Sequence, residues 1–356
     1  MKRRRKTKKV RVGGLFVGGD APIAVQSMTN TDTRDAEATI RQIRELAEEG
    51  CEIVRVAVPD EQAALALGRI KKEISIPLVA DIHFSARLAL EAVRQGVDKL
   101  RINPGNIGSR RGVERVVKAC KERGIPIRIG VNAGSLEKGL LERYGGKATP
   151  QAMVESALGH VAILEDSGFD DIVVSMKASD IDRTAEAYRL FSRRAPYPLH
   201  IGITEAGTSF RGTIMSSIGL GILLYDGIGD TLRVSLTADP VEEVRVGREI
   251  LRSLGLRKGG VIVTSCPTCG RTEVDLVGLA REVENALRRV NKEIHVAVMG
   301  CTVNGPGEAR EADLAIVGGK GFGLIARSGK IIRKVPEREL LKEFLKEVER
   351  FESDTD

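Results

Sequence analysis

The chain has 356 residues, of which 42% are hydrophobic and 29% are charged, enough for a large domain with a small one or for two domains of ordinary size. No apolar run approaches the roughly 20 residues that cross a bilayer, and no signal-peptide core follows the basic start, so we expect a soluble cytoplasmic protein. Five cysteines are too few for a secreted disulfide framework, which favours reduced thiols or a metal centre. We interpret Cys51 and Cys120 as small core residues.

Positive charge is concentrated at the N-terminus. The formal charge is +7, but residues 1–11 carry eight Lys or Arg and no acid, which leaves 48 basic and 49 acidic residues in the rest of the chain. We interpret this stretch as a solvated terminal segment that leads into a first strand. Basic tails bind phosphate polymers non-specifically, so we do not expect nucleic acid as a partner.

Eight short β-branched runs alternate with helical patterns between residues 22 and 240. In residues 35–50, Ile40, Ile43 and Leu46 recur at helical spacing and Gly50 ends the pattern. Strand followed by helix, eight times over, predicts an α/β fold, and the count of eight favours a (β/α)8 TIM barrel over an open doubly wound sheet. We expect an extended loop at 144–151, between the fifth and sixth runs. The runs are 22–28, 52–59, 77–84, 99–104, 126–134, 171–179, 198–207 and 231–240.

The rhythm changes after residues 253–260. We predict a TIM-barrel substrate-binding domain over 1–252, with an N-terminal β-hairpin, and a smaller α+β domain over 260–356. The elements expected in the smaller domain are a strand (261–265), a helix (274–290), a strand (293–300), a Gly-rich loop (301–308), a strand (312–319), a hairpin (322–335) and a terminal helix (337–350).

Polar side chains interrupt the late part of the buried runs, where the site of a TIM barrel lies. Spacings of two or four place the members of each run on one face of their strand. If that face is the interior, five cations converge, and burying them costs several kcal/mol per ion unless anions compensate. Salt bridges at the rim are the alternative, but a multiply charged anionic substrate bound by arginine is favoured. The residues are Arg55, Asp81, His83, Arg101, Asn103, Arg128, Asn132, Ser175, Lys177, Glu205, Arg233 and Ser235.

Three of the polar residues are candidates for proton transfer. Glu205 lies in "GITEAG", where apolar neighbours would favour its protonated form and nearby cations its carboxylate, so it could donate a proton. His83 and His200 could act as acid–base groups, although a lone strand histidine is more often a hydrogen-bonded core or rim residue.

A possible metal site lies in the smaller domain. Cys266 and Cys269 form a C-x-x-C pair in "SCPTCGR", a spacing shared by redox disulfides, zinc sites and iron–sulfur sites. Cys301 and Glu308 follow in the Gly-rich "GCTVNGPGE". Three thiolates on two loops indicate a fourth ligand other than cysteine, and zinc with His295 is one possibility.

Several motifs together resemble one family. They are "VQSMTNTDT", "VADIHF", "LRINPGNIG", "VVSMKAS", "DGIGDTLRVSLTADP", "SCPTCGR" and "GCTVNGPGE". In order and content they resemble the bacterial 4-hydroxy-3-methylbut-2-enyl diphosphate synthases of the methylerythritol phosphate route to isoprenoids. The similarity runs from about residue 10 to residue 350, and the short linker is similar to that of the two-domain bacterial form.

The resemblance implies specific roles. Cys266, Cys269 and Cys301 match the three thiolate ligands of a [4Fe–4S] cluster, and Glu308 matches a carboxylate on the fourth iron, an exchangeable ligand that leaves one corner for substrate oxygen. Glu205 matches an acid that protonates the departing hydroxyl. The matched substrate contacts are the basic residues Arg55, Arg101, Arg128, Lys177 and Arg233 and the polar residues Asn132 and Ser235. Met215 departs from the family, where lysine is common.

The resemblance also implies a reaction and partners. The reaction is the reductive opening and dehydration of 2-C-methyl-D-erythritol 2,4-cyclodiphosphate, with electrons from flavodoxin or ferredoxin. Implied too are a ferredoxin/sulfite-reductase-like fold for the cluster domain and a homodimer in which that domain of one subunit caps the barrel of the other. Two alternatives remain open: a zinc-containing barrel lyase acting on a sugar phosphate, with Lys177 as a Schiff-base nucleophile, and a zinc module that binds nucleic acid with help from residues 1–11.

Overall fold

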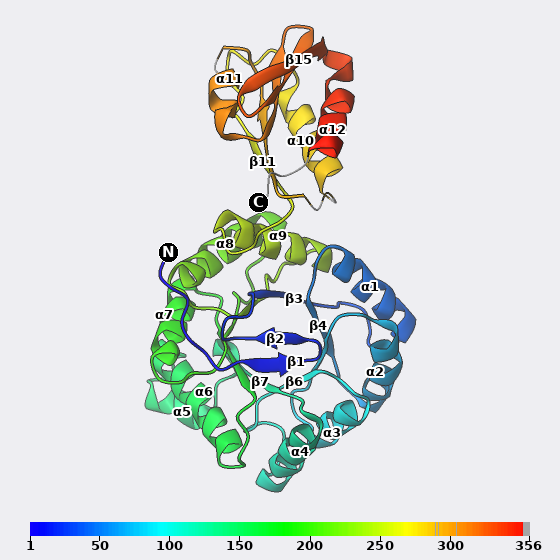
Figure 1. The fold of residues 1–356 in the computed structure, drawn as a ribbon. Coiled ribbons are helices and arrows are strands. Elements are labelled where there is room, and N and C mark those ends of the chain that lie inside the picture. Colours follow the sequence, from blue (N-terminus) through cyan, green and yellow to red (C-terminus); the bar gives the residue numbers. More distant parts are fainter. Residues whose placement is uncertain (289, 291, 304, 352–356) are drawn as a thin grey trace. The chain divides into compact units, whose positions relative to one another are not determined.

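Two units make up the chain, Met1–Arg257 and Lys258–Asp356, and Figure 1 shows the helices and strands of each. The computed structural model describes residues 1–288, 290, 292–303 and 305–351, and for Pro306 and Glu308 it describes the backbone alone. Within these residues no helix is long and apolar enough to cross a membrane.

All eight predicted runs form strands of one parallel barrel in the first unit. The sheet order is β8-β7-β6-β5-β4-β3-β10-β9, and a bridge between Val174 and Leu199 brings the two edges together. The TIM-barrel prediction is therefore confirmed. The strands are β3 (Ala24–Met28), β4 (Ile53–Ala57), β5 (Leu78–Asp81), β6 (Lys99–Ile102), β7 (Ile127–Asn132), β8 (Ile172–Lys177), β9 (His200–Ile201) and β10 (Thr231–Leu232).

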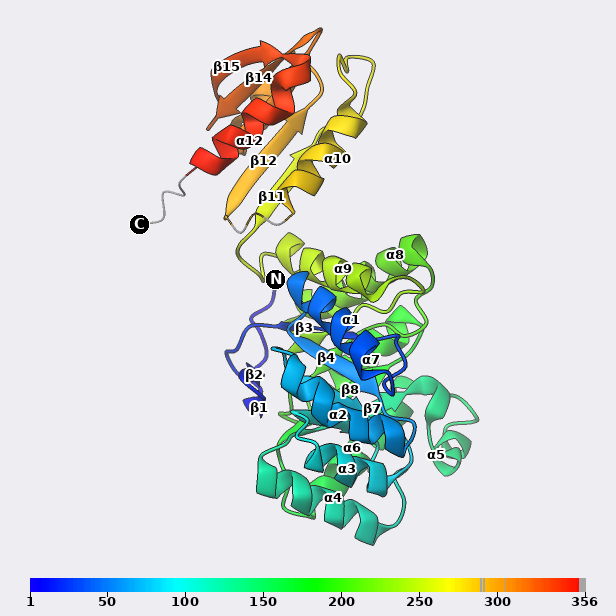
Figure 2. The ribbon, with the colours of Figure 1, turned by 90° about the vertical axis from the view of Figure 1, so that its right-hand side faces the viewer.

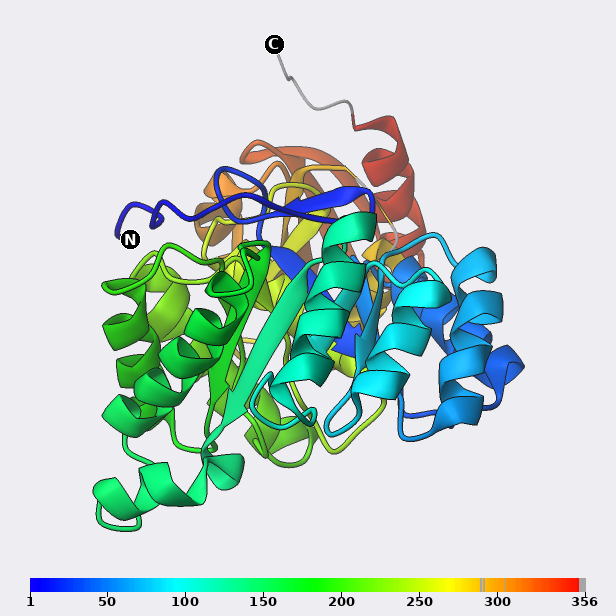
Figure 3. The same ribbon diagram turned by 90° about the horizontal axis from the view of Figure 1, so that it is seen from below.

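Helices form a ring around the barrel (Figure 1), and Figure 3 shows several of them lying over the outside of its strands. Side chains such as Val54, Leu100 and Ile129 face outward into the main core of the unit. Seven of the eight longer helices of the described barrel begin at a side chain that caps a backbone N–H, namely Asp35, Asp60, Ser85, Ser109, Thr149, Asp180 and Asp239. The helices are α1 (Ala36–Glu48), α2 (Glu61–Glu73), α3 (Ala86–Arg94), α4 (Arg110–Arg123), α6 (Pro150–Glu165), α7 (Ile181–Ser192), α8 (Ser209–Tyr225) and α9 (Pro240–Ser253).

The segment between β7 and α6 is less extended than predicted. It contains the 3-10 turn η1 (Ala133–Ser135) and the short helix α5 (Lys138–Arg143). The loop expected at 144–151 ends early, because Thr149 caps α6 and Pro150 occupies its first turn, where proline needs no hydrogen-bond partner.

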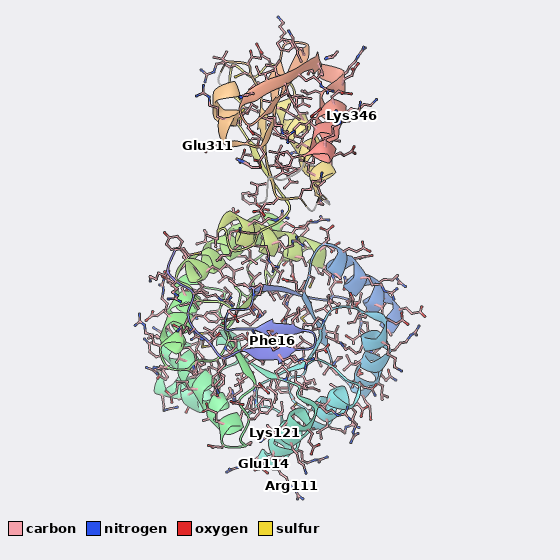
Figure 4. All side chains as sticks on the ribbon, viewed as in Figure 1. Phe16, Arg111, Glu114, Lys121, Glu311 and Lys346 are labelled. Carbon is pink, nitrogen blue, oxygen red and sulfur yellow. The ribbon has the colours of Figure 1, made fainter. Side chains whose placement is uncertain are left out.

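A hairpin of β1 (Val10–Val12) and β2 (Leu15–Val17) closes the end of the barrel where the strands begin. Val10, Val12 and Val17 form a small core with four residues at the beginnings of barrel strands, Ala24, Ile53, Val79 and Val173. The hairpin and α5 lie at opposite ends of the barrel (Figure 2), and Phe16 of β2 lies across the middle of the closed end (Figure 4). The other end, where the strands finish, remains available for a site.

Three of the basic residues before the hairpin, Arg4, Arg5 and Lys8, are partly buried against the barrel, so the interpretation of a solvated segment is wrong for these three. The Lys8 amide donates to the Pro196 carbonyl at 2.8 Å, and Arg4 pairs with the buried carboxylate of Asp230 at 2.8 Å. The Arg5 guanidinium donates to the carbonyl oxygens of Ser192, Ala195 and Tyr197. These acceptors are about 190 or more residues away in sequence, so no local pattern indicates them.

The second unit is a five-stranded mixed sheet with its two longer helices on one face, the α+β arrangement that was predicted. Strands β11 (Val261–Ser265), β12 (Ile294–Met299) and β13 (Leu314–Gly319) are parallel, and β14 (Phe322–Arg327) and β15 (Lys330–Pro336) continue the sheet antiparallel. Helices α10 (Leu276–Leu287) and α12 (Leu340–Arg350) pack on one face through residues such as Val283 and Phe344. The predicted Gly-rich loop is partly helical, because α11 (Gly305–Glu308) and the 3-10 turn η2 (Ala309–Glu311) occupy its end.

Docking of the basic segment gives a stability prediction. We expect Arg5→Ala to lower the free energy of unfolding by about 1.5–3 kcal/mol, because three carbonyls lose a charged donor. Arg3→Ala is the matched control: Arg3 is exposed, and its side chain has no hydrogen bond or ion pair in the part of the chain that is described. Urea denaturation followed by circular dichroism measures both, and equal stabilities of the two variants would contradict the assigned role of Arg5.

Candidate active site

Charged side chains line the inside of the barrel, where branched apolar residues are usual. The inward-facing cations are Arg55, Lys99, Arg101, Arg128, Lys177 and Arg233. Lys99 and Arg128 are fully buried, and Arg101 and Lys177 nearly so. Two carboxylates face these six cations, Asp81 from β5 and Glu243 from α9. The interior of the described barrel thus holds more basic than acidic side chains.

Asp81 is the carboxylate at the centre of the cations. Its oxygens lie 3.1 Å from Arg101 Nη1 and 3.7 Å from Arg55 Nε, and His83 Nε2 is 3.6 Å away. Burial alone would raise the pKa of Asp81, but Arg55, His83, Arg101 and Arg128 together lower it well below its usual range. Asp81 is therefore ionised at every ordinary pH and holds two arginines in place.

Arg101 and Asn103 lock β6 to β7 through one glycine. Arg101 Nη2 donates to the Gly130 carbonyl at 2.9 Å, and the Gly130 amide donates to Asn103 Oδ1 at 2.9 Å. A Cβ at Gly130 would lie 2.8 Å from Arg101 Cζ, so this position needs glycine. The carboxamide oxygen of Asn103 is thus engaged on the protein itself, and Arg101 presents its charge from a fixed place.

Glu243 was not identified from the sequence. Its carboxylate accepts two bonds of 3.1 Å from Arg233, in the bidentate geometry of a strong pair. Ser27 Oγ donates to it at 3.1 Å, and the Leu236 amide donates at 3.0 Å. Because Glu243 reaches the barrel from the first turn of a covering helix, strand periodicity gives no signal for it.

The inside of the barrel, near the beginnings of its strands, contains buried polar atoms that have no hydrogen-bond partner. Among the described atoms, Lys99 Nζ, the Gln26 amide, Arg128 Nε and Nη1, and His200 Nε2 have no hydrogen-bond partner. Burial first, and then neighbouring cations that include Arg128, lower the pKa of Lys99, Lys177 and His200. Lys99 precedes Arg101 by two residues, so the same spacing rule could have identified it. His200 is fully buried and hydrogen-bonded to Thr231 at 2.8 Å, which matches the alternative of a hydrogen-bonded core histidine.

The remaining predicted residues lie where the strands end. Lys177 Nζ fits against Gly202, where a Cβ would lie 2.6 Å from it. Asn132 and Ser235 are half-buried, whereas Glu205 and His83 are exposed, so the apolar surroundings expected for Glu205 are wrong. The backbone of Glu205 has a φ of 55°, a left-handed conformation that costs a non-glycine residue roughly 1–2 kcal/mol. Such strain is typical of functional loops.

Two cysteines of the second unit come together at one edge of its sheet. Cys266 follows β11 and Cys301 follows β12, two adjacent parallel strands, and the amide of Gly300 donates to Cys266 Sγ at 3.3 Å. Cys269 lies in the exposed turn beyond β11, where a backbone hydrogen bond from Arg271 lowers the pKa of its thiol. Among the described residues no three His, Cys, Asp or Glu side chains form a group ready to hold a metal. The side chain of Glu308 is not among the described parts of the chain.

The donor chemistry fits an iron–sulfur group. Three thiols on two neighbouring loops, with an N–H directed at sulfur, match the ligands and hydrogen bonds of such clusters, and metal binding commonly completes the arrangement of its own ligands. His295 does not join them. It lies near the start of β12, roughly 20 Å of strand from Cys301, and its ring contacts Thr264 Oγ1 and the Glu311 carbonyl. Cys51 and Cys120 are buried, and burial raises the pKa of both thiols to about 12, which confirms them as core residues.

A hollow of about 360 Å³ lies elsewhere, on the outer surface between α4 and the end of α6. Its lining includes Glu114 and Lys121, which Figure 4 shows on the outside of the helix ring. Charges of both signs line it, and it is separate from the ends of the strands, so it does not belong to the candidate site.

The sequence matches known protein families over most of its length. Residues 7–248 match the family described as "GcpE TIM-barrel domain", and residues 262–350 match "GcpE protein C-terminal domain". The chain belongs to the GcpE family. Among its relatives, a protein of Clostridium perfringens is 61% identical over 97% of this chain and 99% of its own length, and one of Geobacter sulfurreducens is 63% identical over 97% and 98%. Both are named 4-hydroxy-3-methylbut-2-en-1-yl diphosphate synthase (flavodoxin), which confirms the resemblance seen in the motifs.

Solved structures similar to this GcpE-family chain show its barrel fold. Dihydropteroate synthase from Stenotrophomonas maltophilia has a TM-score of 0.52 at 14% identity, over 70% of this chain and 97% of that protein. The same enzyme from Xanthomonas albilineans has a TM-score of 0.50 at 14% identity, over 69% and 97%. At such low identity the likeness concerns the fold alone.

The central role of Asp81 gives a prediction for this GcpE barrel. We expect Asp81→Asn to lower the free energy of unfolding by about 3–5 kcal/mol at neutral pH, because buried arginines lose their counter-charge. Since the folded pKa of Asp81 is lowered, this loss is complete above its unfolded pKa of about 3.9 and shrinks as the pH falls further.

Asp32→Asn is the control, because Asp32 pairs with Arg34 on the surface, where both side chains are about half exposed and the effect stays within about 1 kcal/mol. Urea denaturation at several pH values compares the two variants. Equal losses, or a loss for Asp81→Asn that is independent of pH, would contradict the assignment.

Proposed function

We propose that the chain converts 2-C-methyl-D-erythritol 2,4-cyclodiphosphate to (E)-4-hydroxy-3-methylbut-2-enyl diphosphate in the methylerythritol phosphate pathway of isoprenoid synthesis. The reaction takes up two electrons and two protons and releases one water. The observation that carries the proposal is the barrel of six inward cations facing two carboxylates, since a cyclic diphosphate supplies the missing negative charge. The names of relatives about 60% identical support the same reaction, and they do not support the zinc-containing lyase.

The substrate binds at the end of the barrel where the strands finish. Arg128 and Lys177 have charges that no described carboxylate contacts, and they bind phosphate oxygens from below. Arg55 and Arg101 are held by Asp81, and Arg233 by Glu243, so these three arginines present fixed N–H groups to the same anion. His83, Asn103, Asn132 and Ser235 complete the polar contacts around the ring. Glu205, in its strained turn, donates the proton that lets the hydroxyl leave as water.

A [4Fe–4S] cluster is the group we assign to the second unit, held by Cys266, Cys269 and Cys301 with Glu308 as the fourth, exchangeable ligand. When bound, it supplies the two electrons one at a time. The Gly300 amide, 3.3 Å from Cys266 Sγ, stabilises thiolate charge at that ligand. The first unit is then the substrate-binding domain, predicted over 1–252, and the second the cluster domain, predicted over 260–356.

The electron donor is an acidic one-electron carrier, flavodoxin or ferredoxin. The relatives carry flavodoxin in their names, which supports the first of the two. Such carriers, and the free thiols of Cys51 and Cys120, belong to the reducing cytoplasm, where we place the protein.

We also infer a homodimer in which the cluster domain of one subunit serves the barrel of the other. Helix α8 supports an interface with a second copy, because Phe210, Ile214, Ile218 and Tyr225 are exposed along it and residues 212–225 include no charged side chain. An uncharged apolar helix face is typical of interfaces in homodimers.

Iron content and turnover test the reaction. We expect anaerobically purified protein to be brown, to show an iron–sulfur EPR signal when reduced, and to convert the cyclic diphosphate with reduced flavodoxin. Colourless protein with stoichiometric zinc, and no iron after anaerobic reconstitution, would overturn the proposal. In the same assay Glu308→Ala keeps most of the iron, because three thiolates remain, but loses most turnover; full turnover would remove the role assigned to Glu308.

Mixed dimers test whether the site is shared. Arg128→Met disables the barrel and Cys269→Ser disables the cluster domain, so each homodimer is inactive. Co-expressed subunits form heterodimers as about half of all dimers, and each has one intact pair of a barrel and a cluster domain, which predicts about a quarter of wild-type activity per subunit. If every site lies within one subunit, the mixture stays inactive and the shared site is disproved.

A further inference from the structure

His160 connects two loops of the barrel from the side. It lies on α6 with 4% of its surface exposed. The amide of Gly105, in the loop that follows β6, donates to His160 Nδ1 at 3.2 Å. His160 Nε2 lies 2.9 Å from Oε1 of Glu137, in the segment that follows β7. One imidazole therefore joins the loops that continue from Asn103 and from Asn132.

The contacts define the tautomer of the imidazole. Because Nδ1 accepts the Gly105 N–H, the proton of the neutral ring is on Nε2, which donates it to Glu137. Ser156 Oγ also donates to Glu137 Oε1 at 3.0 Å and orients the carboxylate. Gly105 is required for this approach, since a Cβ there would lie 2.7 Å from His160 Cε1.

We propose that His160 is a positioning residue that, in its neutral form, holds the loops after β6 and β7 in the conformation that binds the diphosphate substrate. This rests on the substrate site proposed above. The link to that site is short: Asn103 is two residues before Gly105, and its carboxamide fixes the Gly130 amide of β7 beside Arg101. Loss of the Gly105 contact frees the loop from which Asn103 extends.

Protonation reverses the contact. A proton on Nδ1 turns it into a donor facing the Gly105 N–H, so the loop must move away. Burial lowers the pKa of His160 below its usual value of 6.5, and the opposing effect of Glu137, the charged group that faces the ring within the described residues, is smaller. The neutral form therefore holds the loops at and above neutral pH, and substrate affinity falls as the pH drops below about 6.5.

Three substitutions at His160 separate its two hydrogen bonds. His160→Asn places Oδ1 near the position of Nδ1 and keeps an acceptor for Gly105 without an ionisable ring. His160→Gln places its amide near Nε2 and keeps the contact to Glu137 alone, and His160→Leu removes both. His295→Asn is the control for loss of a histidine in the second unit, whose ring lies against the Glu311 carbonyl.

The first readout is steady-state kinetics of the reconstituted full chain between pH 5.5 and 8. We expect the KM for the cyclic diphosphate to rise about tenfold in the Gln and Leu variants, the cost of one unsatisfied N–H, with kcat little changed. The Asn variant keeps a KM close to that of the wild type at pH 8 and loses the rise in KM at low pH. A structural role alone would not remove that pH dependence, and Asn and Gln variants with equal KM values would overturn the proposal.

The second readout is hydrogen exchange in residues 103–108 of the full chain, compared between variants at one pH. We expect faster exchange in the Gln and Leu variants at pH 7.5, and in the wild type relative to the Asn variant at pH 5.5. Unchanged exchange in all variants would disprove the contact. Because this measurement needs no turnover, failure of the wild type to convert the substrate would overturn the proposed reaction and leave the loop contact to be judged separately.

Discussion

An excess of buried positive charge is the constraint on which the barrel depends. Six cations face inward and two carboxylates oppose them, although isolated buried charge costs several kcal/mol per ion. The fold bears this cost because the outer faces of the same strands pack a continuous apolar core with the helices. The hairpin seals the opposite end with valines. The free protein therefore holds a site in which an anion relieves charge repulsion that is already present.

The cations are held by groups that leave them little freedom to reorganise when an anion arrives. Asp81 binds two arginines, Glu243 binds Arg233 through two bonds, and Gly130 admits the Arg101 guanidinium against the backbone. Most of the entropic cost of fixing these side chains is thus met during folding. This separates two kinds of residue: the cations that we propose to bind the anion, and the carboxylates and glycines that fix them.

Much of the fold was predictable, because each barrel strand and helix carries its own periodic pattern, and eight repeats permit few architectures. The inward cations followed from spacing alone, and Lys99 obeys the same spacing as Arg101. Contacts between distant segments were not predictable. Glu243 reaches the site from a helix, the partners of Arg5 are about 190 residues away, and the exposure of Glu205 depends on the path of its loop. The thiols of Cys266, Cys269 and Cys301 were recognisable because they lie in two short sequence motifs, "SCPTCGR" and "GCTVNGPGE".

Docking of the basic segment on loops near the end of the barrel bears on how the chain folds during synthesis. Arg5 binds Ser192 and Tyr197, Arg4 binds Asp230, and β3 pairs with β10. Arg5 can meet its acceptors only after residue 197 has been made, and β3 can pair with β10 only after residue 232, so the barrel cannot close one repeat at a time. Until those distant segments have been made, Arg4 and Arg5 lack the partners that they have in the folded barrel.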